Sequence, residues 1–213
     1  MNQRFDSHLL WGSHSPLSAL TGAGLVILAS TRFAYALICT GALFWIYGLT
    51  ALIFSSARGI MPKQGRMAVL LFLSAFLCGL FMLLTGLLNP LLVLSTGFFL
   101  VLIPPCFLGS GFFEASETEY PVEVFSRAIF EALVISALIL ALALVREPLG
   151  MGVISFPGGV QGIIELFGSN DDEAFVPVRL LSAAGGGLLL LGYVTALFRY
   201  FRQRSGSVPG DGS

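Results

Sequence analysis

Charged residues are scarce in this sequence: 11% of its 213 residues are Asp, Glu, Lys or Arg, whereas 56% are hydrophobic. A water-soluble domain carries about 25% charged residues, because its surface must be solvated. The scarcity of charge therefore excludes a soluble domain large enough to catalyse a reaction by itself. The net charge of −1 gives no sign of a nucleic-acid-binding surface.

Cysteine is scarce as well. The three cysteines, Cys39, Cys78 and Cys106, all lie inside apolar segments and form no Cys-x-x-Cys pair. An odd number in such surroundings excludes the disulfide framework of a secreted protein. The chain by itself also lacks the four thiols of a zinc or iron–sulfur site, so a metal bound here needs ligands from a partner. We interpret Cys78 as a small packing residue of the core.

Long apolar runs take the place of charge. A helix that crosses a bilayer needs about 20 mostly apolar residues. Five runs reach or approach this length: residues 33–55, 67–88, 91–113, 128–145 and 178–200. A shorter run, residues 17–29, contains Gly22 and Gly24, and we predict that it forms a short or broken helix that still crosses. The predicted fold class is an all-α integral membrane protein with six transmembrane helices.

The predicted membrane domain covers residues 17–202, between an N-terminal segment, residues 1–16, and a Gly- and Ser-rich tail, residues 203–213, that we expect to be disordered. Lys and Arg are enriched on the cytoplasmic side of membrane proteins. With six crossings, Arg32, Arg146 and Arg179 fall on one side and the other eight of the eleven basic residues fall on the side of both termini. We therefore predict that both termini are cytoplasmic.

Two predicted interruptions occupy corresponding places in the two halves of the chain. The first lies at residues 22–24 (Gly-Ala-Gly) and the second at residues 104–106 (Pro-Pro-Cys). Three crossings per half make the second half inverted relative to the first, and paired broken helices in a 3+3 inverted repeat indicate a site near the bilayer midplane. The alternative left open is that the glycines allow close helix packing and the prolines merely kink one span.

Glu131 is a carboxylate inside an apolar run, four residues after Arg127. Ionisable groups within the membrane mark ion pathways, so Glu131 is a candidate ligand on such a path. The spacing of four residues also allows an ion pair with Arg127 near the membrane interface. Both interpretations stay open at this point.

Several short strings carry a family resemblance. Residues 61–67 read Met-Pro-Lys-Gln-Gly-Arg-Met, and residues 146–152 read Arg-Glu-Pro-Leu-Gly-Met-Gly. Four single residues between them complete the pattern: Pro90, Gly97, Gly111 and Glu114. In this order and at this spacing, they resemble the small six-helix subunits of the Rnf and Nqr ion-pumping redox complexes, in particular the E subunit of Rnf and the D subunit of Nqr. The resemblance covers residues 14–202.

The resemblance implies an electron-transfer role in the bacterial inner membrane. In this family two homologous six-helix subunits lie face to face, inverted with respect to each other, beside further membrane subunits. Each places one cysteine on each of its two broken helices, and the four thiolates hold a 2Fe-2S cluster. That cluster relays electrons across the bilayer, coupled to sodium or proton transport.

The sequence departs from the family at both ligand positions. Aligned from the neighbouring strings, Gly24 takes the place of the first cysteine and Phe107 the place of the second, and neither residue can coordinate iron. A shift of one residue at the prolines restores Cys106, which is therefore our candidate cofactor and metal ligand. Cys39 is a second candidate only if the first segment is rearranged. A 2Fe-2S cluster shared with a partner, and the loss of that cluster, both stay open.

The sequence therefore predicts a membrane subunit of an Rnf/Nqr-like ion-translocating electron-transport complex, which relays electrons across the bilayer or scaffolds that relay. Such a chain is part of a translocase and not an enzyme alone. Two alternatives are a structural paralogue without a redox centre and a small independent transporter built on an inverted repeat.

Overall fold

Helices make up most of the part of the chain that the structure describes. The computed structural model describes residues 20–57, 65–109, 121–158, 162–167, 181 and 183–206. Within these ranges, four segments are long and apolar enough to cross a membrane: α3 (Phe33–Ala57), α4 (Arg66–Leu88), α5 with α6 (Pro90–Leu100, Ile103–Gly109) and α8 (Pro121–Met151). The apolar helices predicted from the sequence are confirmed for these four segments.

Two further helices bring the described helical segments to six, the number predicted. α2 (Leu20–Ala29) is short, and α9 (Ala184–Gly206) has a short apolar stretch, so neither reaches the length and hydropathy of the other four. α9 extends into the segment predicted to be a disordered tail. The predicted N-terminal segment and the basic residues at positions 58, 63 and 179 lie outside the described residues.

The segment α5–α6 is interrupted at residues 101–102, next to the predicted position. Pro104 and Pro105 have no amide N–H, so the carbonyls of Leu100 and Val101, four residues earlier, lose their helical donors. The chain passes through a turn instead, and α6 then resumes as a separate helix of seven residues. The covalent structure of proline therefore explains why this span is discontinuous.

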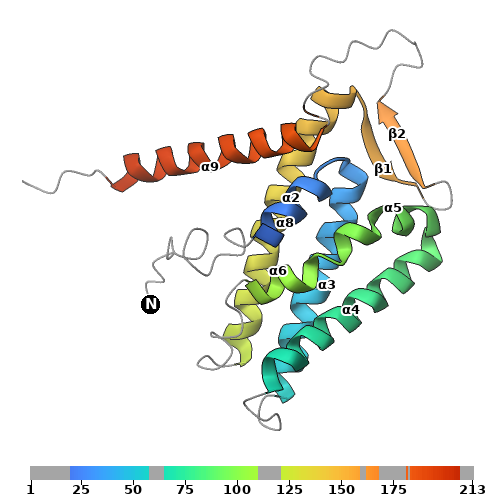
Figure 1. The fold of residues 1–213 in the computed structure, drawn as a ribbon, viewed down its shortest axis with the longest axis vertical. Helices are drawn as coiled ribbons and strands as arrows, with labels where there is room; N and C mark the ends of the chain where they lie inside the picture. Colours follow the sequence, from blue (N-terminus) through green and yellow to red (C-terminus); the bar gives the residue numbers. More distant parts are fainter. Residues whose placement is uncertain are drawn as a thin grey trace, which may run out of the picture.

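α3 lies at the centre of the bundle. It runs alongside α8 in the opposite direction and also contacts α4, α5 and α6 (Figure 1). Both helices contribute fully buried apolar side chains to the core, among them Leu43 and Ile46 of α3 and Ile139 of α8. α4 turns a large part of its surface outward, with Phe72 and Phe76 mostly exposed, as expected for a helix whose outer face contacts lipid.

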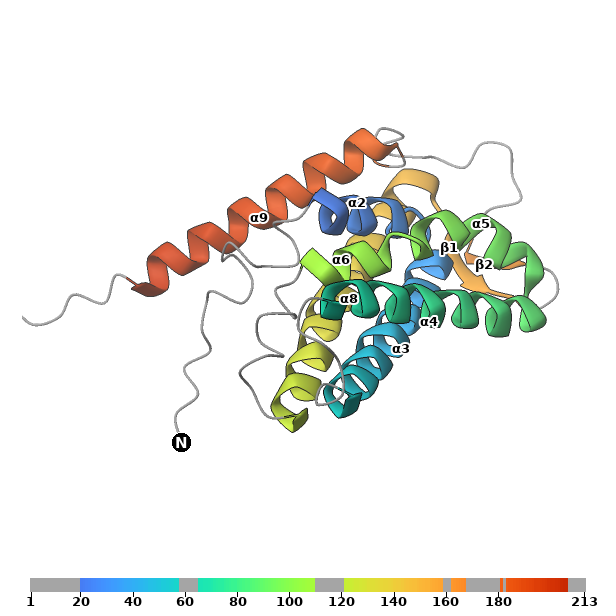
Figure 2. The same ribbon diagram turned by 60° about the horizontal axis from the view of Figure 1, so that its bottom comes forward.

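A small antiparallel hairpin closes one end of the bundle, in the connection between the apolar runs at residues 128–145 and 178–200. β1 (Ile154–Pro157) pairs with β2 (Ile163–Phe167) and contacts α3 and α8. The same end contains the C-terminal end of α2 and the turn between α4 and α5 (Figure 1). α9 starts nearby, contacts α2 and α8, and then extends away from the other helices (Figure 2).

Candidate functional site

The first predicted interruption, at residues 22–24, is wrong, because α2 is one continuous helix from Leu20 to Ala29. Glycine lowers helix propensity by only about 1 kcal/mol and, unlike proline, keeps its backbone N–H. The short helix α2 packs against α6, the helix that follows the interruption at residues 101–102. α6 carries Cys106, which is fully buried. α2 carries Gly24, where an added Cβ would meet no atom within 4 Å. The predicted first ligand position therefore has no donor atom, although it has room for a larger side chain.

A phenol holds the Cys106 side chain. The Tyr47 hydroxyl donates a hydrogen bond to Cys106 Sγ at 3.8 Å. The Tyr47 ring also packs edge-to-face on Phe107, with ring centroids 4.6 Å apart, a geometry that aromatic pairs favour. All three side chains are fully buried, so Phe107 is a packing residue and α3 anchors α6 just after its prolines.

Cys78 contributes more than the packing that we predicted for it. Its thiol donates to the Leu100 carbonyl at a Sγ···O distance of 3.3 Å. Leu100 is the residue whose helical donor is missing because position 104 is proline. A thiol is a weak donor, but in a buried segment it satisfies a carbonyl that would otherwise lack a partner. Cys78 on α4 therefore stabilises the interruption between α5 and α6.

We expect Cys78→Ala to lower the free energy of unfolding by about 1 kcal/mol, because the Leu100 carbonyl loses a buried donor. The matched control is Cys78→Ser, which keeps a hydroxyl donor and should stay within about 0.5 kcal/mol of the wild type. Unfolding in detergent micelles by titration with a denaturing detergent measures both. An equal loss in the two variants would show that the thiol only fills space.

The donor set of this chain does not match a half-site with one thiol on each broken helix. No cysteine occurs before Cys39 in the sequence, so α2 has none. Cys39 is buried on α3, outside both α2 and the segment α5–α6. Among the described residues, no three His, Cys, Asp or Glu side chains are grouped closely enough to hold a metal ion. α2 and α6 together therefore contribute one thiol, that of Cys106.

Glu131 is buried in α8, with 3% of its side chain exposed, and forms the ion pair that its spacing allowed. Its Oε1 lies 3.3 Å from Nε of Arg127, one turn earlier on the helix. The Arg127 side chain is 31% exposed, so the pair leads from the bundle interior towards its surface. The interpretation as an ion pair is confirmed, and a role on an ion path stays a prediction.

A second polar centre, which we did not predict as a site, surrounds Arg146 near the C-terminal end of α8. The side chain is fully buried and donates three short hydrogen bonds to backbone carbonyls: to Ile27 at 2.6 Å, to Leu181 at 2.6 Å and to Ala183 at 2.8 Å. Carbonyls at the C-terminal end of a helix such as α2 carry partial negative charge, which stabilises the guanidinium. Arg146 therefore joins α8 to the end of α2 and the start of α9.

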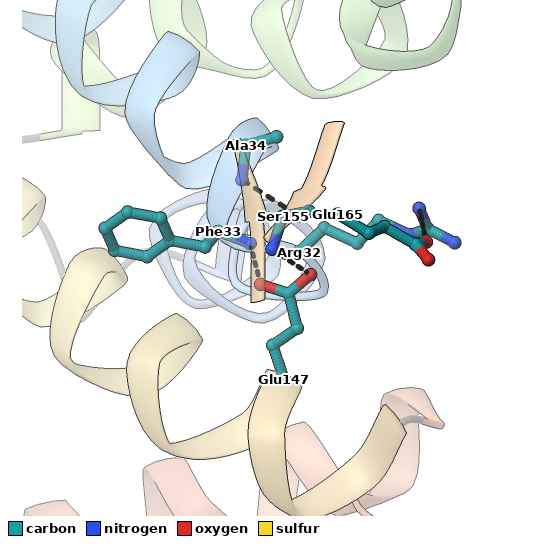
Figure 3. A network of polar contacts seen from close by, with 6 residues as sticks. All are labelled: Arg32, Phe33, Ala34, Glu147, Ser155 and Glu165. Atoms are coloured by element: carbon teal, nitrogen blue, oxygen red, sulfur yellow. Dashed lines mark hydrogen bonds and ion pairs between the residues drawn. The ribbon is translucent and has the colours of Figure 1, made fainter. Parts of the chain in front are cut away.

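Glu147, the next residue, also binds the backbone, but it accepts hydrogen bonds from amides (Figure 3). Its Oε2 accepts from Phe33 N at 2.7 Å and its Oε1 accepts from Ser155 N at 3.1 Å. The Ser155 hydroxyl oxygen in turn accepts from Ala34 N at 3.3 Å. The first amides of a helix have no partner within it, so the carboxylate acts as a cap for α3 that α8 supplies. A charged pair at the end of a long apolar run was the signal for this site in the sequence.

Gly187 on α9 lies directly against the Arg146 guanidinium. A Cβ at this position would lie 2.9 Å from both Arg146 Nη1 and Ile27 Cγ2. We expect Gly187→Ala to cost about 1–3 kcal/mol, the usual range for overpacking. In Gly192→Ala, the control on the same helix, the Cβ meets no atom within 4 Å, and the better helix propensity of Ala should add stability, by up to about 1 kcal/mol. Thermal unfolding in detergent compares the two, and equal shifts would contradict the close packing.

The sequence matches no model of a protein family and no curated protein. The resemblance to the Rnf and Nqr subunits therefore depends on the short strings in the sequence. Gly111 and Glu114 in those strings lie outside the described residues, whereas Arg146 and Glu147 belong to the polar centre at the end of α8.

Proposed function

We propose that this chain is a membrane subunit of an Rnf/Nqr-like ion-translocating electron-transport complex, placed in the bacterial inner membrane with both termini in the cytoplasm. Its partners in this proposal are a homologous, inverted six-helix subunit and further membrane subunits. The observation that carries the proposal is the contact between α2 and α6. α2 is unusually short and the segment α5–α6 is interrupted at its prolines. Discontinuous backbone within a membrane is stable only where protein or a cavity surrounds it, and a pair of short or Pro-interrupted segments is a pointer to a functional centre.

Within that complex, the residues of this chain favour a scaffolding role over a role in which the chain supplies two of the four cluster ligands. The position aligned with the first cysteine is Gly24, and Cys106 Sγ already accepts the Tyr47 hydroxyl. A cluster held by four thiolates would need at least three thiolate ligands in addition to Cys106. The chain therefore holds the relay together while other subunits carry the electrons.

The test is to purify the complex from its own cells through an affinity tag on this chain and to compare the wild type with Cys106→Ser. We expect flavin- or iron–sulfur-bearing subunits to purify with it, and iron content and electron paramagnetic resonance spectra to be the same in both samples. Cys39→Ser is the control, because it changes a buried thiol that lies outside α2 and α6. Loss of iron in Cys106→Ser alone would reject the scaffolding role, and the absence of any redox subunit would reject the complex.

One observation favours a second function, that of an independent transporter. Glu131 is a buried carboxylate in a helix that is long and apolar enough to cross a membrane, and such carboxylates are typical of ion pathways. This function predicts ion flux into vesicles that contain the purified chain alone, and loss of that flux in Glu131→Gln. Under the leading proposal, these vesicles show no more flux than protein-free vesicles.

A further inference from the structure

The hairpin end of the bundle contains hydrogen bonds that connect two segments, the short helix α2 and the interrupted segment α5–α6. On the side of the first segment, Arg146 Nη1 donates to the Ile27 carbonyl at 2.6 Å and to Ser30 Oγ at 3.2 Å. Ile27 lies in the last turn of α2, and Ser30 follows the helix. The end of α2 is therefore held by a side chain from α8.

On the side of the second segment, Asn89 has two roles. Its Oδ1 accepts from Leu92 N at 3.1 Å, which caps the start of α5, and its Nδ2 donates to the Gly162 carbonyl at 3.0 Å. Asn89 is 7% exposed, so both bonds are protected from water. Gly162 has a φ of +87°, a conformation that glycine adopts without steric cost. The start of α5 is therefore held by the hairpin.

Glu147 connects these two sides. It accepts from the first amide of α3 and from Ser155 N in β1, and β1 pairs with β2, which begins directly after Gly162. An ion pair between Arg32 and Glu165, 3.6 Å apart, adds a more exposed contact between the α2–α3 turn and β2 (Figure 3). Hydrogen bonds and backbone pairing thus lead from α2 through α8 and the hairpin to α5.

We propose that Arg146, Glu147, the hairpin and Asn89 form a clamp that fixes the end of α2 relative to the start of α5. Interfaces of this kind switch between discrete packed states and do not deform gradually. The short helix α2 and the interrupted segment α5–α6 therefore separate only when the clamp releases, and loosening the clamp at either side loosens the other. The proposal concerns conformational coupling and does not depend on the proposed function.

Hydrogen–deuterium exchange of the full chain in detergent micelles tests the coupling. Asn89→Asp keeps the oxygen that caps α5 but removes the amide donor to the Gly162 carbonyl. If the effect of this change is only local, faster exchange is confined to the amides of α5 and the hairpin. We expect the amides at the end of α2 to exchange about tenfold faster, the factor that loss of one buried hydrogen bond produces. Glu165→Gln, which changes only the exposed ion pair, is the control and should leave α2 exchange within about twofold.

The converse variant is Glu147→Gln, which should speed exchange at the start of α5 by a similar factor. The effects of coupled contacts are non-additive. In the double variant Asn89→Asp/Glu147→Gln, the increase in amide exchange rate should therefore be only slightly larger than the larger of the two single-variant increases. If Glu147→Gln does not fold, Ser155→Ala takes its place in the experiment. This variant removes the hydroxyl group that accepts from Ala34 N in the same network. Faster exchange confined to the elements next to each substitution, or fully additive effects, would overturn the clamp.

Discussion

Replacing Arg146 with methionine is expected to lower the free energy of unfolding by about 3–5 kcal/mol, because three backbone carbonyls lose a charged donor at once. The variant leaves the Ile27 carbonyl without this donor in a buried site, and the Leu181 and Ala183 carbonyls without it in partly buried ones. Each unsatisfied group costs about 1–3 kcal/mol, so part of this loss must be relieved by local rearrangement.

Arg146→Lys is the matched control. Lysine keeps the positive charge, but its donors are all on one nitrogen and cannot reproduce the planar fork that spans α2 and α9. We expect an intermediate loss of about 1–3 kcal/mol. Denaturing-detergent titrations measure both variants, and equal stability of the wild type and Arg146→Met would show that the guanidinium does not hold these helices.

Replacing Glu147 with alanine is expected to cost about 2–4 kcal/mol, because the change removes a helix cap and a second buried acceptor at once. The amides of Phe33 and Ser155 are the groups left without a partner. Glu165→Ala is the control: its ion pair with Arg32 is exposed, and such pairs contribute about 0–1 kcal/mol. Thermal unfolding followed by circular dichroism ranks the two, and the reverse order would contradict the cap.

The positions of the helices could be predicted well where an apolar run has sharp ends. The run at residues 33–55 corresponds to α3, and the run at 67–88 corresponds to α4. The run at 128–145 was too short, since α8 begins at Pro121 and continues to Met151. Apolar length misses helical turns that carry charges, and the parts of α8 outside that run include Glu123, Arg127 and the Arg146–Glu147 pair.

The candidate site was predicted less completely. Cys106 lies on α6, which packs on the continuous helix α2, and its contact with Tyr47 joins side chains that are 59 positions apart. The bonds of Arg146 and Glu147 to α2 and α3 cross more than 110 positions. These last bonds leave no periodic pattern in the sequence, because each depends on one side chain and on backbone groups that any residue type provides.

The sequence by itself determined the membrane-like composition, the apolar helices and the break before Cys106, because apolar length and the missing N–H of proline are local properties of the chain. Only the tertiary structure decided that α2 packs on α6, that a hairpin closes one end of the bundle, and which backbone groups Arg146 and Glu147 bind. Those outcomes depend on which segments meet in space, and the free energy of a buried charge is set by the partners that it finds there.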